Sequence, residues 1–304
     1  MSKHTNRLGK SETVLTRPDR PEDYHCNCNL CSNFLGEIYD TENDKYYSNR
    51  IRKGYYVDAA GEHLDVGQII GYRYAVQNFC PEGGWVFDPT VGSGTAIVEA
   101  INNGRNAVGI ELEFPHVAQK NIEAQIFHNQ SYDLIPGDAL ETEALLAQHD
   151  FHKPDFDLIV NGTPYPTKGG KSSDAPERKN FKTGSEEVQN WTFDYEDPKN
   201  IGKAREGGQW EHLVRTMYNQ SVEFLKPGGY FILIIKDLMR DKKAYPLHKV
   251  IADIVLEDNL DLVPYGYFLH KHVPTTMFMN TYPKRFPDIK IPFYQTGIVL
   301  KKMG

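Results

Sequence analysis

The sequence predicts an α/β fold in which a doubly wound, mostly parallel, Rossmann-like sheet ends in an antiparallel late strand. The first observation is an alternation of short apolar runs, which suit buried strands, with longer segments of helical character. The second is a glycine-rich turn at 92–95, between one such run and the helix that follows it. The third is a pair of strand-like runs at 260–269 and 295–301, which we expect to form a terminal antiparallel pair.

The glycine-rich turn lies in a strand–turn–helix–strand unit. Residues 85–87 (Trp-Val-Phe) form a short apolar run, which the following Asp-Pro pair breaks. Residues 96–103 have helical character, and Gly104 suits a C-terminal helix cap. A second apolar strand at 106–110 ends at Glu111. A glycine turn brings backbone close to a ligand, and an acidic residue after the next strand can bind both hydroxyls of a ribose, so the unit is predicted to bind a nucleoside.

The spacing of the glycines excludes two common phosphate-binding motifs. Gly92 and Gly94 have no third glycine at the dinucleotide-binding spacing, and no lysine follows Gly94 as a P-loop requires. The pattern Asp-Pro-x-x-Gly-Ser-Gly-Thr at 88–95, followed by Gly-Arg-x-x-x-Gly-Ile-Glu, instead resembles the amino-group DNA methyltransferases, which use S-adenosylmethionine. The resemblance covers about 63–301 and implies a methyltransferase sheet.

The same resemblance implies which residues bind the cofactor. Asp138 follows a predicted strand at 133–135 and matches the family's acidic residue that hydrogen-bonds the adenine amino group. An Asp here also suits a helix N-cap, and the two roles are compatible. The implied cofactor-binding residues are Asp88, Pro89, Thr90, Gly92, Ser93, Gly94, Thr95, Glu111, Leu112, Asp138 and Ala139.

The other elements follow from periodicity and turn residues. Helices are predicted at 63–79, 115–127, 141–149, 210–225 and 246–258. Further buried strands are predicted at 156–160 and 230–235, the second after a Lys-Pro-Gly-Gly turn that is common in methyltransferases of this fold.

The strand at 156–160 leads into a turn that matches the family's catalytic tetrapeptide, (Asp/Asn/Ser)-Pro-Pro-(Tyr/Phe). In that motif an acceptor side chain and a backbone carbonyl hold the two protons of an exocyclic amine, while the aromatic ring stacks on the flipped base. Gly162, Thr163, Pro164 and Tyr165 align with it, so the tyrosine and one proline are kept and the acceptor position is glycine. Asn161 or Thr163 would then supply the acceptor; the alternative is a noncatalytic relative.

The chain is predicted to divide into an N-terminal arm, 1–62, and a catalytic domain, 63–304, with a polar insertion at about 166–209. Five Lys/Arg against two acids between 166 and 183 suit capture of a nucleic-acid strand. Trp191 or Trp210 would act there as wedges or stacking platforms, unless the insertion is a solvated loop.

The arm contains three clustered cysteines, Cys26, Cys28 and Cys31. Thiolates at this spacing suit a structural Zn²⁺ or an iron–sulfur cluster, and the alternative is free thiols in a loop. A fourth ligand would come from a histidine or from Cys80.

Composition places the chain among ordinary globular proteins: 304 residues, 39% hydrophobic, 25% charged, and a net charge of −7. We expect no membrane segment, no secretory signal and a cytoplasmic location. The resemblance implies methyl transfer from S-adenosylmethionine to cytosine N4 or adenine N6 of a flipped base in DNA. The alternatives are an RNA amino-methyltransferase and a catalytically inactive nucleic-acid-binding relative.

Overall fold

The structure, a computed structural model, describes residues 2–5, 11–15, 33–39, 69–125, 129–166, 197–205, 207–236, 238–240, 243–271 and 294–304. Cys26, Cys28, Cys31 and most of the predicted insertion lie outside the described residues. The division into an arm and a catalytic domain stays a prediction.

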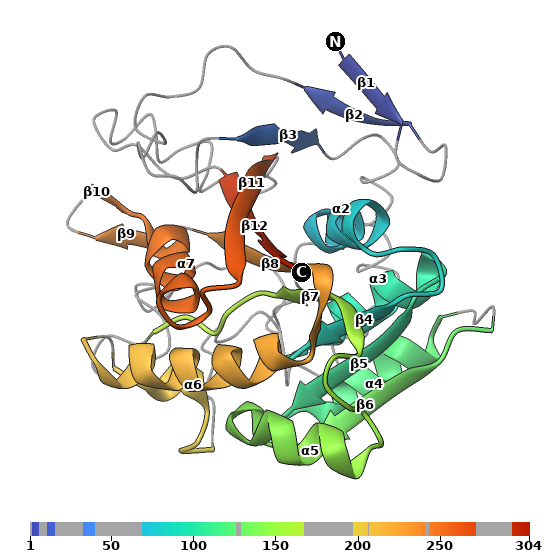
Figure 1. The fold of residues 1–304 in the computed structure, drawn as a ribbon. Helices are drawn as coiled ribbons and strands as arrows, with labels where there is room; N and C mark the ends of the chain where they lie inside the picture. Colours follow the sequence, from blue (N-terminus) through green and yellow to red (C-terminus); the bar gives the residue numbers. More distant parts are fainter. Residues whose placement is uncertain are drawn as a thin grey trace, which may run out of the picture.

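A single sheet of ten strands organises the described chain, in the order β1-β2-β3-β11-β12-β8-β7-β4-β5-β6 (Figure 1). A separate hairpin is formed by β9 (Leu238–Arg240) and β10 (Lys243–Tyr245). The strands of the large sheet are β1 (Ser2–Thr5), β2 (Ser11–Leu15), β3 (Phe34–Tyr39), β4 (Trp85–Asp88), β5 (Asn106–Glu111), β6 (Tyr132–Pro136), β7 (Phe156–Asn161), β8 (Leu225–Lys236), β11 (Leu262–Lys271) and β12 (Tyr294–Lys302).

The directions of the strands confirm the predicted fold class. Strands β6, β5, β4, β7 and β8 pair in parallel, and β12 is inserted antiparallel to both β8 and β11. The sheet is therefore doubly wound and mostly parallel in its centre, with an antiparallel late strand, as in Rossmann-like methyltransferases. The chain runs from β4 outward to β6 and then returns to the other side of β4, so a topological switch point lies between β4 and β7.

Helices cover both faces of this sheet, because consecutive residues of the central strands, which point to opposite faces, are buried. One core contains α2 (Ile69–Phe79), α3 (Thr95–Asn102) and α4 (Pro115–Glu123). The opposite core contains α5 (Thr142–Gln148), α6 (Gln209–Glu223) and α7 (Leu247–Asp258). Of the described helices, none is long and apolar enough to cross a membrane.

The structure differs from the sequence-based expectations at the edges of elements. Helix α2 spans Ile69–Phe79, within the predicted helix at 63–79, and residues 63–68 lie outside the described residues. Strand β8 begins at Leu225, because residues on both sides of the predicted Lys-Pro-Gly-Gly turn pair with β7 through an irregular register. Strand β3 pairs in parallel with β11, and no prediction from the sequence covers this pairing.

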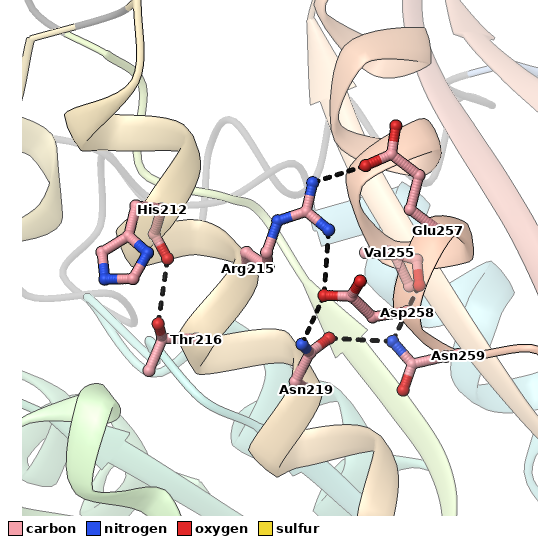
Figure 2. A network of polar contacts seen from close by, with 8 residues as sticks. All are labelled: His212, Arg215, Thr216, Asn219, Val255, Glu257, Asp258 and Asn259. Carbon is pink, nitrogen blue, oxygen red and sulfur yellow. Dashed lines mark hydrogen bonds and ion pairs between the residues drawn. The ribbon is translucent and has the colours of Figure 1, made fainter.

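A polar network joins α6 to α7 beyond the apolar core (Figure 2). Arg215 forms ion pairs with Glu257 at 2.6 Å and with Asp258 at 2.9 Å. Asn219 donates to Asp258 at 2.8 Å and accepts from Asn259 at 3.0 Å. The network connects one side of α6 to α7. The opposite side of α6 faces the sheet and contributes Trp210 and Tyr218 to the candidate active site.

Candidate active site

The site lies where β4 and β7, adjacent and parallel, reach their carboxyl ends at the switch point. Ligands of open α/β sheets bind at this position, because the loops diverge there and leave a crevice. The two strands end in Asp88 and Asn161, both of which are buried. The predicted cofactor-binding and catalytic turns therefore start side by side.

A hydrogen-bond cluster connects the two turns. The amide nitrogen of Asn161 donates to Asp88 Oδ1 at 2.6 Å and to Thr90 Oγ1 at 2.7 Å. The backbone N–H of Thr90 donates to the same Asp88 oxygen at 3.0 Å. Both amide hydrogens of Asn161 are thus used on the cofactor turn, so Asn161 fixes the separation of the two turns.

Burial raises the pKa of Asp88 to about 7, because the carboxylate loses hydration. The hydrogen bonds from Asn161 and from the Thr90 backbone act in the opposite direction, and the nearby Glu111 raises the pKa further. Near neutral pH, Asp88 is therefore poised between its neutral and charged forms.

We expect Asp88→Asn to remove a pH dependence of stability. The raised pKa means that the folded state binds a proton between about pH 4 and 7 that the unfolded state has released, so wild-type stability falls as pH rises through this window. The free energy of unfolding of Asp88→Asn minus that of wild type should grow by a few kcal/mol from pH 4 to pH 8, since each pKa unit corresponds to about 1.4 kcal/mol. Chemical denaturation at several pH values measures the difference, and a constant difference contradicts the raised pKa.

Glu111 ties the glycine turn to the end of β5. Its Oε2 accepts from the backbone N–H of Gly92 at 2.8 Å. Its Oε1 accepts from the backbone N–H groups of Glu113 at 3.0 Å and Phe114 at 3.1 Å. Burial raises the pKa of Glu111, and these backbone hydrogen bonds counteract the rise. The carboxylate is consequently held in one position beside the glycine turn.

The glycine turn is seated by close packing from two sides. Gly94 has φ +91°, and a Cβ there would lie 3.3 Å from the backbone of Ala118 in α4. A Cβ on Gly109 in β5 would lie 1.8 Å from the side chain of Val91, so that glycine lets the turn rest directly on the strand. Asn121 of α4, which the sequence-based prediction missed, donates to the Ser93 carbonyl at 2.7 Å.

Asp138 is half-buried after β6, on the same edge of the sheet as Glu111. Its Oδ1 accepts from the backbone N–H of Leu140 at 3.0 Å, so it caps the short 3-10 helix Ala139–Glu141. One of its predicted roles, the N-cap, is thereby confirmed, and its contact with adenine stays a prediction. Leu112 is half-buried after β5, and Ala139 is buried.

The remaining predicted cofactor residues cluster in the same turn. The side-chain hydroxyls of Ser93 and Thr95 lie 3.4 Å apart, and both residues are buried. Pro89 is also buried, immediately after Asp88. The structure thus brings together, at one edge of the sheet, the whole set predicted from the sequence.

The predicted catalytic turn, 162–165, is anchored by two large residues of α6. The indole N–H of Trp210 donates to the Pro164 carbonyl at 2.9 Å. Trp210 is fully buried, so the expectation that it acts as a wedge or stacking platform is wrong; it supports the turn from beneath. Tyr165 is half-buried and packs partly against the same core.

Tyr218 of α6 connects two residues at the start of the turn. Its hydroxyl donates to Asn161 Oδ1 at 2.5 Å, so the Thr163 hydroxyl donates to the Tyr218 oxygen. Tyr218 and Asn161 are fully buried, and Thr163 nearly so. Helical spacing of apolar residues in 210–222 predicts that Tyr218 is buried, but the partners of its hydroxyl are visible only in the folded chain.

We expect Tyr218→Phe to destabilise the protein. The substitution leaves buried oxygens of Asn161 and Thr163 without a partner, which costs about 2–4 kcal/mol of the free energy of unfolding. The matched control, Tyr265→Phe, changes an exposed tyrosine and should leave stability within about 0.5 kcal/mol of wild type. Urea denaturation of both variants checks the prediction, which is wrong if their stabilities agree.

The zinc prediction rests on residues that the structure does not describe. Within the described residues, no group of three or more His, Cys, Asp or Glu side chains could hold a metal ion. Cys80 is buried between α2 and β4, and burial raises the pKa of its thiol to about 12. Arg105 donates to the Cys80 carbonyl at 2.8 Å.

The sheet has the topology of a Rossmann-like methyltransferase fold, and part of the chain matches a known protein family. Residues 72–120 match the model of a family described as DNA methylase, the N6/N4 methyltransferases. This segment contains most of α2, the glycine turn and Glu111, so the resemblance to amino-group DNA methyltransferases is confirmed there. No curated protein matches the chain.

Several solved structures are similar to the chain at low sequence identity. A TehB-like S-adenosylmethionine-dependent methyltransferase from Corynebacterium glutamicum is 12% identical, with 86% of this chain and 98% of that chain covered and a TM-score of 0.42. A methyltransferase from Pyrococcus furiosus is 13% identical, with 87% and 100% covered and a TM-score of 0.44. An rRNA methylase from Streptococcus thermophilus is 10% identical, with 79% and 99% covered and a TM-score of 0.41.

Proposed function

We propose that the protein transfers a methyl group from S-adenosylmethionine to an exocyclic amino nitrogen, cytosine N4 or adenine N6, of a base flipped out of DNA. The observation that carries the proposal is the direct hydrogen bond between Asp88 and Asn161 at the switch point. It supports one site in which the donor turn and the amine-binding turn act together. The DNA methylase family match at 72–120 supports a nucleobase in DNA as the acceptor.

The chemistry of the residues fits the donor. Two carboxylates, Glu111 and Asp138, follow adjacent strands and suit the ribose hydroxyls and the adenine amino group. Glu111 is held by three backbone N–H groups, so it is preorganised for the ribose. The left-handed backbone at Gly92 and Gly94, with φ of 56° and 91°, makes the turn between β4 and α3 tight.

The catalytic contribution of the chain is positioning rather than covalent catalysis. When bound, the donor supplies an electrophilic methyl group: its carbon–sulfur bond breaks with both electrons kept by sulfur, the amino nitrogen bonds the carbon, and the surplus amine proton passes to water. Tyr165 stacks on the base, and the turn directs the nitrogen lone pair toward the methyl group. Asn161, Tyr218 and Trp210 hold this turn against the donor turn.

Incubation with tritiated S-adenosylmethionine and DNA of mixed sequence, followed by digestion to nucleosides, tests the function. Label on N4-methylcytosine or N6-methyladenine supports it and identifies the base. A parallel incubation with RNA tests the alternative acceptor. If donor binding is measurable by calorimetry but neither nucleic acid takes up label, the protein is a noncatalytic relative and the proposal is wrong.

A further inference from the structure

The glycine in the catalytic turn has a tyrosine hydroxyl where its side chain would be. A Cβ built on Gly162 lies 2.8 Å from the phenolic oxygen of Tyr72. This is closer than real Cβ atoms approach other heavy atoms, so a side chain at 162 would force the Tyr72 hydroxyl to move from its position. Tyr72 belongs to α2 and is 6% exposed, and its ring is part of the core between α2 and the sheet.

Neither of the two acceptors suggested by the sequence is well placed for the target amine. Asn161 is fully buried, its amide hydrogens are used on Asp88 and Thr90, and its oxygen accepts from Tyr218. The Thr163 hydroxyl is buried and directed at Tyr218. Both side chains therefore hold the turn from beneath, and their polar atoms face the protein interior.

We infer that the Tyr72 hydroxyl replaces the missing side chain at 162 and accepts one hydrogen of the target amine. The inference rests on the proposed function and deepens it. A phenolic oxygen carries lone pairs that accept an N–H, as the oxygen of Asp, Asn or Ser does. The hydroxyl is fixed by a helix that packs on the strands carrying the turn, so it is as preorganised as a side chain of the turn itself.

The substitution Tyr72→Phe removes only the proposed acceptor atom. We expect kcat for DNA methylation to fall about 10- to 100-fold, the effect of losing one hydrogen bond to a group that becomes charged, with KM and donor affinity near wild type. Tyr74→Phe is the matched control: Tyr74 lies on the same helix, is similarly buried and packs on Phe268 at a centroid distance of 4.8 Å. Its kcat should equal that of wild type.

A second pair of variants tests the exclusion between the two positions. Gly162→Ser places a Cβ against the Tyr72 oxygen, so we expect a lower melting temperature and lower kcat. Tyr72→Phe combined with Gly162→Ser removes the clash and restores an acceptor hydroxyl in the turn. The double variant should recover the melting temperature and exceed both single variants in kcat.

The outcomes separate this inference from the proposed function. If wild type and Tyr72→Phe methylate DNA with equal kcat, Tyr72 is not the acceptor and the function stands. If the double variant has lower kcat than either single variant, the replacement is also wrong. If wild type labels no nucleic acid, the proposed function fails, and the inference fails with it.

Discussion

Glu111→Ala should abolish measurable binding of S-adenosylhomocysteine, the demethylated donor, and lower the free energy of unfolding by about 2–4 kcal/mol. The alanine removes the acceptor of three backbone N–H groups, those of Gly92, Glu113 and Phe114. The glycine turn then loses its tie to β5, and the ribose loses its predicted partner. Isothermal titration calorimetry measures the affinity, and urea denaturation measures the stability.

Glu111→Gln separates the two effects. The amide keeps one oxygen, which can still accept from Glu113 and Phe114, but its NH₂ group faces the N–H of Gly92 as a second donor. Donor affinity should fall about 10- to 100-fold with a smaller loss of stability. Glu113→Gln is the matched control, because Glu113 accepts from Asn200 rather than from the turn, and it should bind like wild type. Wild-type affinity in Glu111→Gln would contradict the role of Glu111.

The sequence predicts most of the central sheet because each of its strands is a short apolar run between turn residues. Residues 85–87, 106–110 and 156–160 each lie within an observed strand. The outer strands were harder to predict. β3 pairs with β2 and, in parallel, with β11, which is distant in the chain, and no local pattern encodes such a distant partner.

Some residues of the candidate site can be predicted from the sequence, and others cannot. Residues that act through backbone and turn geometry, such as Gly94 and Glu111, are recognisable because their spacing is fixed by one strand–turn–helix unit. Residues that reach the predicted catalytic turn from helices elsewhere in the chain cannot be recognised in the sequence. Tyr72 precedes the catalytic turn by ninety positions and Tyr218 follows it by more than fifty, so only the folded chain shows their hydroxyls beside 161–163.

Position 162 looks different in the sequence and in the folded chain. A glycine at 162 looks like a lost function when the four-residue motif is considered alone. In the fold, the space beside this glycine contains a hydroxyl from α2. Glycine at 162 and tyrosine at 72 are sterically matched, because a side chain at 162 would contact the Tyr72 hydroxyl too closely.

Tyr165→Ala should reduce kcat/KM for DNA methylation about 100- to 1000-fold while donor affinity stays at the wild-type value. Tyr165 follows Pro164, and the Pro164 carbonyl accepts a hydrogen bond from Trp210. The backbone that carries the Tyr165 ring is therefore held in place. Stacking of a base on an aromatic ring contributes about 1–3 kcal/mol, and loss of alignment adds to the effect. The donor contacts at Glu111 involve other strands and are unaffected.

Tyr165→Phe is the variant that identifies stacking as the cause. It keeps the ring and removes the hydroxyl, so its kcat/KM should remain within a few-fold of wild type. Tyr265→Ala, at an exposed tyrosine of β11, controls for the loss of an aromatic ring elsewhere and should leave both donor binding and methylation unchanged. If Tyr165→Ala is as active as wild type, the turn at 162–165 is not catalytic. If Tyr165→Phe is as impaired as Tyr165→Ala, the hydroxyl rather than the ring contacts the base.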